Sequence, residues 1–201
     1  TQKDQSGSSL LTGSQKKELL RLARQAITQG CSRGTPPEPK HTSQPPPFLR
    51  EGACFVTLHK SDPEDNQTLR GCIGSTQAYR PLLDDVMNNA FASAFRDQRF
   101  PPVTENELGT IQIEISILTP QQPMAVSHEK DLLQQLRPGV DGLLIRNPRY
   151  SATFLPQVWE QLPNPRQFLA HLKHKAGIPP GIWPEDMECF RYQCFQFEEQ
   201  L

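Results

Sequence analysis

The stretch IQIEISIL, residues 111–118, restricts the fold more than any other part of the chain, because it alternates almost perfectly between apolar and polar side chains. Its four isoleucines stand at every second position, and Gln112, Glu114 and Ser116 stand between them. Successive side chains of a β-strand point to opposite faces, so the pattern predicts a strand with one buried face and one polar face. The chain must therefore build a sheet.

Two other segments predict helices. Apolar pairs repeat every four residues across residues 82–95, with Asp84, Asp85, Asn88 and Asn89 on the opposite face, and the sequence RFPP stops this helix. Residues 12–27 carry a second apolar helical stripe. Its start has the spacing of a capping box, and Gly30 is expected to end it.

The remaining strands are short and come in hairpins. ACFVTLHK (residues 53–60) and TLRGCIGS (68–75) flank a turn, and two short strands surround an Asn-Pro turn within residues 141–155. A helix capped by Asn164 follows, and MECFRYQCFQFEE (187–199) is expected to be one final strand. Antiparallel hairpins without a regular βαβ rhythm indicate the α+β class.

Composition narrows the classes of protein that the chain can be. Its 201 residues suit one domain or two closely joined subdomains, and a formal charge of -1 argues against a nucleic-acid binder. Neither an apolar run of ~20 residues nor a secretory signal is visible, so no membrane partner is expected. Five cysteines without a CxxC pair argue against a zinc site and a disulfide framework, and favour the cytoplasm. Residues 1–9 are polar and expected to be disordered.

Six of the 20 prolines fall between Pro36 and Pro47. Proline lacks a backbone donor and fixes φ, so this run is expected to form neither a regular helix nor a paired strand. Residues 35–47 are interpreted as a semi-rigid connector, with a ligand for an SH3-type domain as the alternative.

The hexamer LRGCIG, residues 69–74, contains the main candidate site. Alternation along a strand places Arg70 and Cys72 on one face, ~7 Å apart, where a cation favours thiolate over thiol. Gly71 and Gly74 leave room beside the sulfur for a ligand. The alternative is a small buried cysteine in a tight strand, since free cysteine is among the most buried residue types.

A nucleophilic cysteine also needs a base. His171 on the late helix is the better candidate and His59 the other, although a solvated or capping role fits each histidine. Glu114 either faces solvent or handles protons. His171 and His174 have the i, i+3 spacing of a metal pair, but without a third ligand no metal site is predicted.

Several motifs together resemble a known family. They are FVTL (55–58), LRGCIG (69–74), NAFASAFRDQRFPP (89–102), IEISIL (113–118), DGLLI (141–145), FLPQVWE (154–160) and FLAHLKHKAG (168–177). In this order they are similar to the hallmarks of the AMMECR-one family, known in prokaryotes as AmmeMemoRadiSam system protein A, over roughly residues 10–199. The chain departs from the family at Lys173, where a cysteine is usual.

The resemblance implies a fold. It consists of two unequal α/β subdomains with antiparallel sheets, the larger over about residues 10–135 and 185–201 and the smaller over about 136–184. The cysteine motif is expected to face a cleft between them. Prokaryotic members are encoded beside a Memo-type protein and a radical SAM protein, which are therefore the expected partners. The resemblance names no substrate, reaction or cofactor.

Two hypotheses about function follow. In the first, the chain is an enzyme or an enzyme component in which Cys72 is the nucleophile, Arg70 holds an anionic substrate, and Glu114 or His171 moves protons. In the second, the same cleft binds a partner or small anion without chemistry. Gly71, Gly74, Ser75 and Arg99 complete the set of expected ligand-binding residues.

Overall fold

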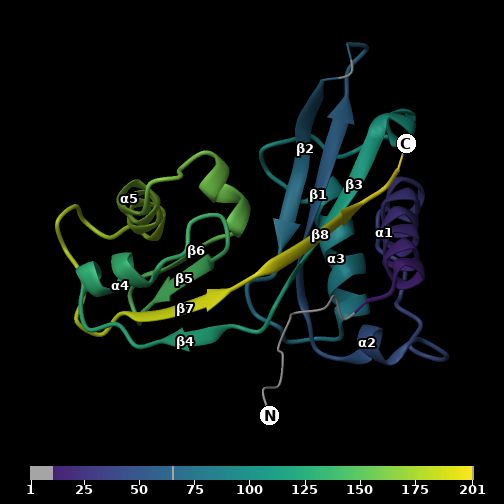
Figure 1. The fold of residues 1–201 in the computed structure, drawn as a ribbon. Coiled ribbons are helices and arrows are strands. Elements are labelled where there is room, and N and C mark those ends of the chain that lie inside the picture. Colours follow the sequence, from purple (N-terminus) through teal and green to yellow (C-terminus); the bar gives the residue numbers. More distant parts are fainter. Residues whose placement is uncertain (1–10, 65, 201) are drawn as a thin grey trace. The chain divides into compact units, whose positions relative to one another are not determined.

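The computed structural model describes residues 11–64 and 66–200, so the predicted disorder of residues 1–9 lies outside the described residues. The chain divides into two compact units (Figure 1), one running to Ile117 and resuming at Phe195, the other comprising Leu118–Cys194. The second unit is larger than the 136–184 expected. It extends beyond the expected range at both ends, because β4 (Gln122–Met124), before that range, pairs with β7 (Glu188–Tyr192), after it. Each unit is described by itself.

The first unit is built on a sheet with strand order β2-β1-β3-β8. The strands are β1 (Ala53–Ser61), β2 (Gln67–Gly74), β3 (Ile111–Leu118) and β8 (Cys194–Glu198). The four isoleucines of β3 are buried, which confirms the predicted face. The opposite face is less exposed than its polarity suggests. Gln112, for example, is only 6% exposed, because its amide donates to the Glu199 carbonyl and accepts from Gln67.

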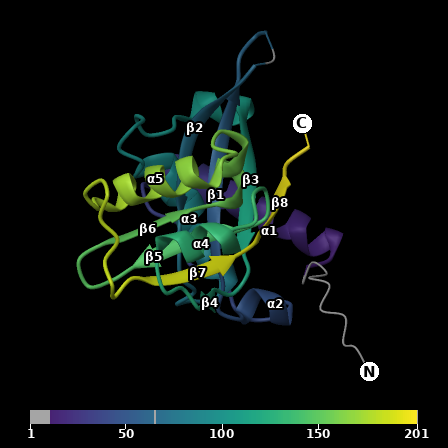
Figure 2. The ribbon, with the colours of Figure 1, turned by 60° about the vertical axis from the view of Figure 1, so that its left-hand side comes forward.

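Helices α1 (Gly13–Arg33) and α3 (Leu82–Phe95) cover the isoleucine face of this sheet and pack against each other (Figures 1 and 2). The capping box of Thr12 and Gln15 is present as predicted. The predicted end at Gly30 is wrong, since α1 continues to Arg33 and ends at Gly34 in the left-handed conformation. A Cβ at position 30 would lie 2.2 Å from the Phe95 ring, so Gly30 serves the close approach of the two helices.

The proline-rich segment is irregular until Pro46–Leu49 forms the short helix α2. The expectation that no helix could form in the run is therefore wrong for its last two prolines. A proline in the first turn of a helix loses no hydrogen bond, because the N–H at that place has no partner within the helix. Phe48 is fully buried in the first core, and His41 Nε2 lies 2.7 Å from Asp84 Oδ1 on α3. Contacts at two places therefore hold the connector to the first unit.

The second unit has an antiparallel sheet with strand order β4-β7-β5-β6, in which β5 is Gly142–Arg146 and β6 is Ser151–Phe154. Helices α4 (Glu129–Gln135) and α5 (Pro165–Ala176) share one core with β5, in which Trp159 stacks on Phe168 with ring centroids 3.8 Å apart. Asn164 caps α5 as predicted.

The predicted final strand is two strands in two different sheets. It breaks at Gln193, whose backbone bonds Thr119 at both its N–H and its carbonyl, and continues as β8 in the first sheet. Among the described residues, no helix has the length and apolar character required to cross a bilayer.

A substitution at Gly71 tests how closely β2 packs on α3. A Cβ at this position would lie 2.1 Å from the Ser93 carbonyl oxygen, a backbone atom that cannot move without shifting α3. We expect Gly71→Ala to lower the free energy of unfolding by about 1 to 3 kcal/mol, the usual cost of overpacking. Gly109→Ala is the control, because nothing lies within 4 Å of the added methyl group. Equal denaturant midpoints for the two variants would contradict the interpretation.

Candidate functional site

The candidate site lies on the face of the first sheet that is turned away from the helices. Thr57 of β1 stands directly opposite Cys72 of β2, and its hydroxyl lies 3.3 Å from the sulfur. Glu114 of β3 points to the same side, because it alternates with the buried isoleucines. We call Thr57, Cys72, Glu114 and the nearby Arg99 the Cys72 face.

Arg70 does not belong to this face. The strand register shifts between Leu58 and His59, which face Gly71 and Leu69 respectively, so Arg70 has no residue opposite it. Its guanidinium instead bonds the Glu107 carboxylate at 3.0 Å and the Pro101 carbonyl at 2.8 Å. The predicted shared face with Cys72 is therefore wrong, because period-two counting fails across a register shift.

The Arg70–Glu107 pair is buried and structural. Arg70 is 7% exposed, and its Nη1 has no hydrogen-bond partner within the described part of the chain. Hydrogen bonding from Arg70 lowers the pKa of Glu107 to about 2. An ion pair of this kind fixes the loop after α3 against β2 and offers no free charge to a ligand.

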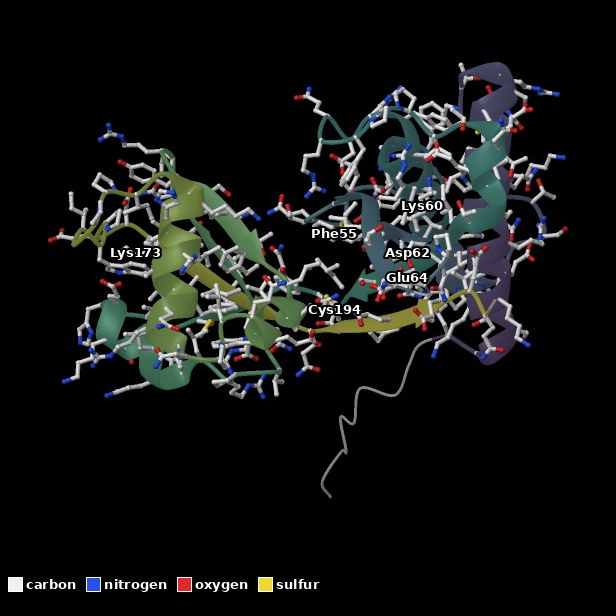
Figure 3. The ribbon with its side chains drawn as sticks, turned by 90° about the horizontal axis from the view of Figure 1, so that it is seen from above. Phe55, Lys60, Asp62, Glu64, Lys173 and Cys194 are labelled. Carbon is white, nitrogen blue, oxygen red and sulfur yellow. The ribbon has the colours of Figure 1, made fainter. Side chains whose placement is uncertain are left out.

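Gly71 and Gly74 are filled by the protein itself. A Cβ at Gly71 would meet the Ser93 carbonyl, and one at Gly74 would lie 2.2 Å from the ring of Phe55, labelled in Figure 3. The expectation that these glycines open space for a ligand is not supported by this packing. They allow α3 and an aromatic ring to approach β2.

The cation near the sulfur is Arg99, which follows α3. Asp97 accepts the Cys72 backbone N–H at 3.0 Å and bonds Arg99 at 2.8 Å, and Arg99 lowers the pKa of that carboxyl far below its usual range. The Arg99 side chain is 58% exposed, whereas that of Asp97 is 5% exposed. Arg99 was among the ligand-binding residues expected from the sequence. Asp97 was not, although both residues lie in the motif RDQRFPP.

The environment of Cys72 favours the thiol. Burial raises the pKa of this thiol most, against the Thr57 hydrogen bond and the Arg99 charge, which lower it. The carboxylates of Asp97 and Glu114 add to the increase. The pKa of Cys72 is therefore raised, whereas the sequence led us to expect a lowered one. A cation is present, but the effect of burial on this pKa is larger than the effect of the cation.

Ser75 belongs to a buried network at the end of β2. Its hydroxyl donates to Asp85 at 2.6 Å, and Asp85 also accepts from Arg80 at 2.7 Å and from the Cys54 backbone. Asn89 bonds the same carboxylate. The predicted outward orientation of Asp85 and Asn89 is wrong, since these residues are 0% and 4% exposed.

The two histidines considered as a base for Cys72 belong to different units. His171 and His174 are exposed on α5 in the second unit, whereas His59 is half-buried on β1, two residues beyond Thr57. Over residues 11–64 and 66–200, no three His, Cys, Asp or Glu side chains are grouped so that they could hold a metal ion.

The buried Arg70–Glu107 ion pair should make the free energy of unfolding depend on pH. The native pKa of Glu107, about 2, lies below the ordinary value of about 4.3, so its ionised form stabilises the fold above pH ~4. This contribution is lost as the pH falls from about 4 to about 2. We expect Glu107→Gln to cost about 3 kcal/mol at neutral pH, because it leaves Arg70 buried without its counter-ion.

Denaturant unfolding of Glu107→Gln and of the wild type at a series of pH values measures this cost. The difference between their free energies of unfolding should become smaller in acid. Glu18→Gln is the control, because its partner Arg21 is 60% exposed and such pairs contribute ~0.5 kcal/mol. An equal cost for both substitutions would contradict a structural role for the Arg70–Glu107 pair.

The Cys72 thiol should respond to its charged neighbours in opposite directions. Arg99→Gln is expected to raise its pKa further, and Glu114→Gln is expected to lower it, because each removes one charge. Iodoacetamide labelling against pH, followed peptide by peptide by mass spectrometry, measures both shifts. Labelling rates at Cys72 that are the same in both variants would contradict this electrostatic arrangement.

Comparison with known proteins gives a consistent result. The AMMECR1 family model matches residues 20–197. Protein MJ0810 of Methanocaldococcus jannaschii is 39% identical over 163 residues, 78% of each chain, and a protein of Thermococcus onnurineus is 36% identical over 188 residues, 90% of this chain and 89% of the relative. The crystal structure of uncharacterized protein PH0010 from Pyrococcus horikoshii matches with a TM-score of 0.80 at 35% identity, covering 91% of this chain and 90% of that one.

Proposed function

Since the chain belongs to the AMMECR1 family, whose member PH0010 is described as uncharacterized, we propose from the site itself that the Cys72 face binds a small anionic ligand. Arg99 is the anchor. Asp97 holds its guanidinium through Nε and Nη2, and the side chain is otherwise 58% exposed. A guanidinium has five N–H donors, so donors remain for a carboxylate or phosphate.

The observation that carries this proposal is the neutral thiol beside an exposed, anchored cation. A thiol and the Thr57 hydroxyl can both hydrogen-bond a ligand without taking part in a reaction. The raised pKa of Cys72 leaves little thiolate at neutral pH, which favours binding over nucleophilic attack.

A specific observation also supports the enzyme hypothesis. The Glu114 carboxylate influences the same sulfur, and it lies on β3, the strand next to the β1 strand that carries Thr57. In this form of the proposal, Glu114 accepts the Cys72 proton once a ligand is bound, and the sulfur adds to a carbonyl carbon of that ligand. The S–C bond forms as the C=O π bond breaks, and its electron pair passes to the carbonyl oxygen. The Memo-type and radical SAM partners would then supply the ligand or consume the product.

Titration calorimetry with sodium phosphate, succinate and citrate at matched ionic strength tests the binding proposal. We expect at least one of these anions to bind, and Arg99→Gln to weaken it about tenfold, because a charge-assisted hydrogen bond contributes roughly 1.5 to 3 kcal/mol. Arg33→Gln, an exposed cation at the end of α1, is the matched control.

Cys72→Ser separates the two hypotheses. The serine hydroxyl replaces the thiol with a slightly smaller group that can still donate and accept a hydrogen bond, so anion binding should survive in this variant. Chemistry that passes through a sulfur nucleophile should disappear from it. Binding that is unchanged in Arg99→Gln would refute Arg99 as the anchor, whatever the result at Cys72.

A further inference from the structure

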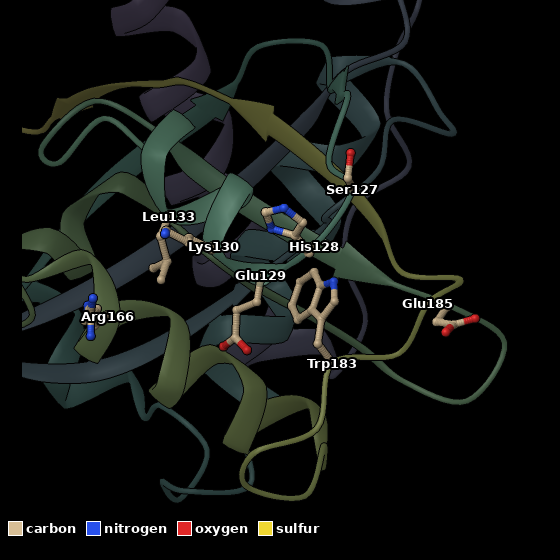
Figure 4. A pocket seen from close by; sticks show the side chains of 8 residues that line it. All are labelled: Ser127, His128, Glu129, Lys130, Leu133, Arg166, Trp183 and Glu185. Carbon is tan, nitrogen blue, oxygen red and sulfur yellow. The ribbon is translucent and has the colours of Figure 1, made fainter.

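The second unit contains a groove of about 820 Å³ that no part of the proposed function uses (Figure 4). It lies between the start of α4, the start of α5 and the segment that joins α5 to β7. This volume is within the ~300–1,000 Å³ usual for small-molecule sites. All the residues that line it belong to the second unit, so the groove is independent of the Cys72 face.

The ring of Trp183 lines this groove, and the backbone on both sides of Trp183 is held by hydrogen-bonded turns. Trp183 lies between two tight turns, in which Ile182 N–H donates to the Pro179 carbonyl and Met187 N–H to the Pro184 carbonyl. Ile178 and Met187 are buried in the core on either side. The ring is half-buried and lines the groove, so its position costs little further ordering when a ligand binds.

Lys173 contacts two of the residues that line the groove, Glu129 and Trp183. Its ammonium donates to Glu129 at 3.1 Å and lies 6.0 Å from the centroid of the Trp183 ring, while the residue is only 7% exposed. The charge of Glu129 is therefore already compensated from inside the protein. The ring and the carboxylate are held together before any ligand arrives.

The remaining charged side chains of the groove have no ion-pair partner in the part of the chain that the structure describes. Lys130 and Arg166 line it, and neither side chain makes a hydrogen bond or ion pair with any other described residue. Figure 4 shows both on one side of the Trp183 ring and Glu185 on the other. With Glu129 compensated, two cations and one carboxylate of the lining are left without an ion-pair partner among the described residues.

We propose that this groove binds a small molecule that combines a planar aromatic group with an anionic substituent, of the kind found in nucleoside monophosphates or aromatic carboxylates. The aromatic group stacks on Trp183, next to the aliphatic Leu133. The anion lies toward Lys130 and Arg166, which offer charge-assisted hydrogen bonds. An amino or other donor group of the ligand would face Glu185.

Titration calorimetry with AMP and with 4-hydroxybenzoate tests this assignment, and adenosine and inorganic phosphate serve as half-ligands. We expect AMP or 4-hydroxybenzoate to bind, the two probes distinguishing phosphate from carboxylate. Adenosine and phosphate alone should each bind at least about tenfold more weakly than AMP if AMP is bound, since each lacks one of the two contacts. Quenching of Trp183 fluorescence gives a second readout, because the only other tryptophan, Trp159, is 3% exposed.

Three variants complete the experiment. Arg166→Gln and Trp183→Leu should each weaken binding about tenfold. Arg149→Gln, an exposed cation on the β5–β6 turn that does not line the groove, should leave the affinity unchanged. The proposal is overturned if neither AMP nor 4-hydroxybenzoate binds, if adenosine or phosphate binds as well as AMP, or if Arg166→Gln binds like the wild type. Cys72→Ser should have no effect, which keeps this outcome separate from that of the proposed function.

Discussion

The register shift between β1 and β2 governs the arrangement of the candidate site. It leaves Arg70 without a residue opposite it, and the guanidinium turns to Glu107 and Pro101 instead of lying beside the sulfur. A different cation, Arg99, then stands near Cys72, held there by Asp97. The identity of the residue that could anchor an anion thus depends on one local change in strand pairing.

Polar groups from α3 and the loop that follows it bind the backbone of β2, at its free edge through Asp97 and between β2 and β1 through Ser93. Asp97 accepts the Cys72 N–H, and Ser93 accepts the N–H of Ile73 while donating to the Val56 carbonyl. Gly71 makes this possible, because only a residue without a side chain lets the α3 backbone come so close. An unpaired N–H on an edge strand invites pairing with another chain, so the Asp97 contact covers this edge as well as fixing the geometry of the site.

Two buried charges near the site illustrate why ionised groups in a core are tolerated. Asp85 is fully buried and receives hydrogen bonds from Arg80, Ser75 and backbone, and Arg70 receives its counter-charge from Glu107. Burial of such pairs has a desolvation cost that their attraction offsets only when the hydrogen bonds are good. Their main effect here is to hold the segments on both sides of Cys72 in one geometry.

Local pattern determined much of this protein. The alternation of IQIEISIL identifies β3 and its buried face, the capping residues identify the starts of α1 and α5, and the ordered motifs identify the family. These features depend on near neighbours in the chain, so they can be read from the sequence. The tertiary structure decided the rest. It moved Arg70 away from Cys72, buried Asp85 and Asn89, and filled the space at Gly71 and Gly74, because each of these outcomes depends on strand register and on atoms from distant segments. It also brought Glu129, Lys173 and Trp183 together, three residues that no spacing rule connects.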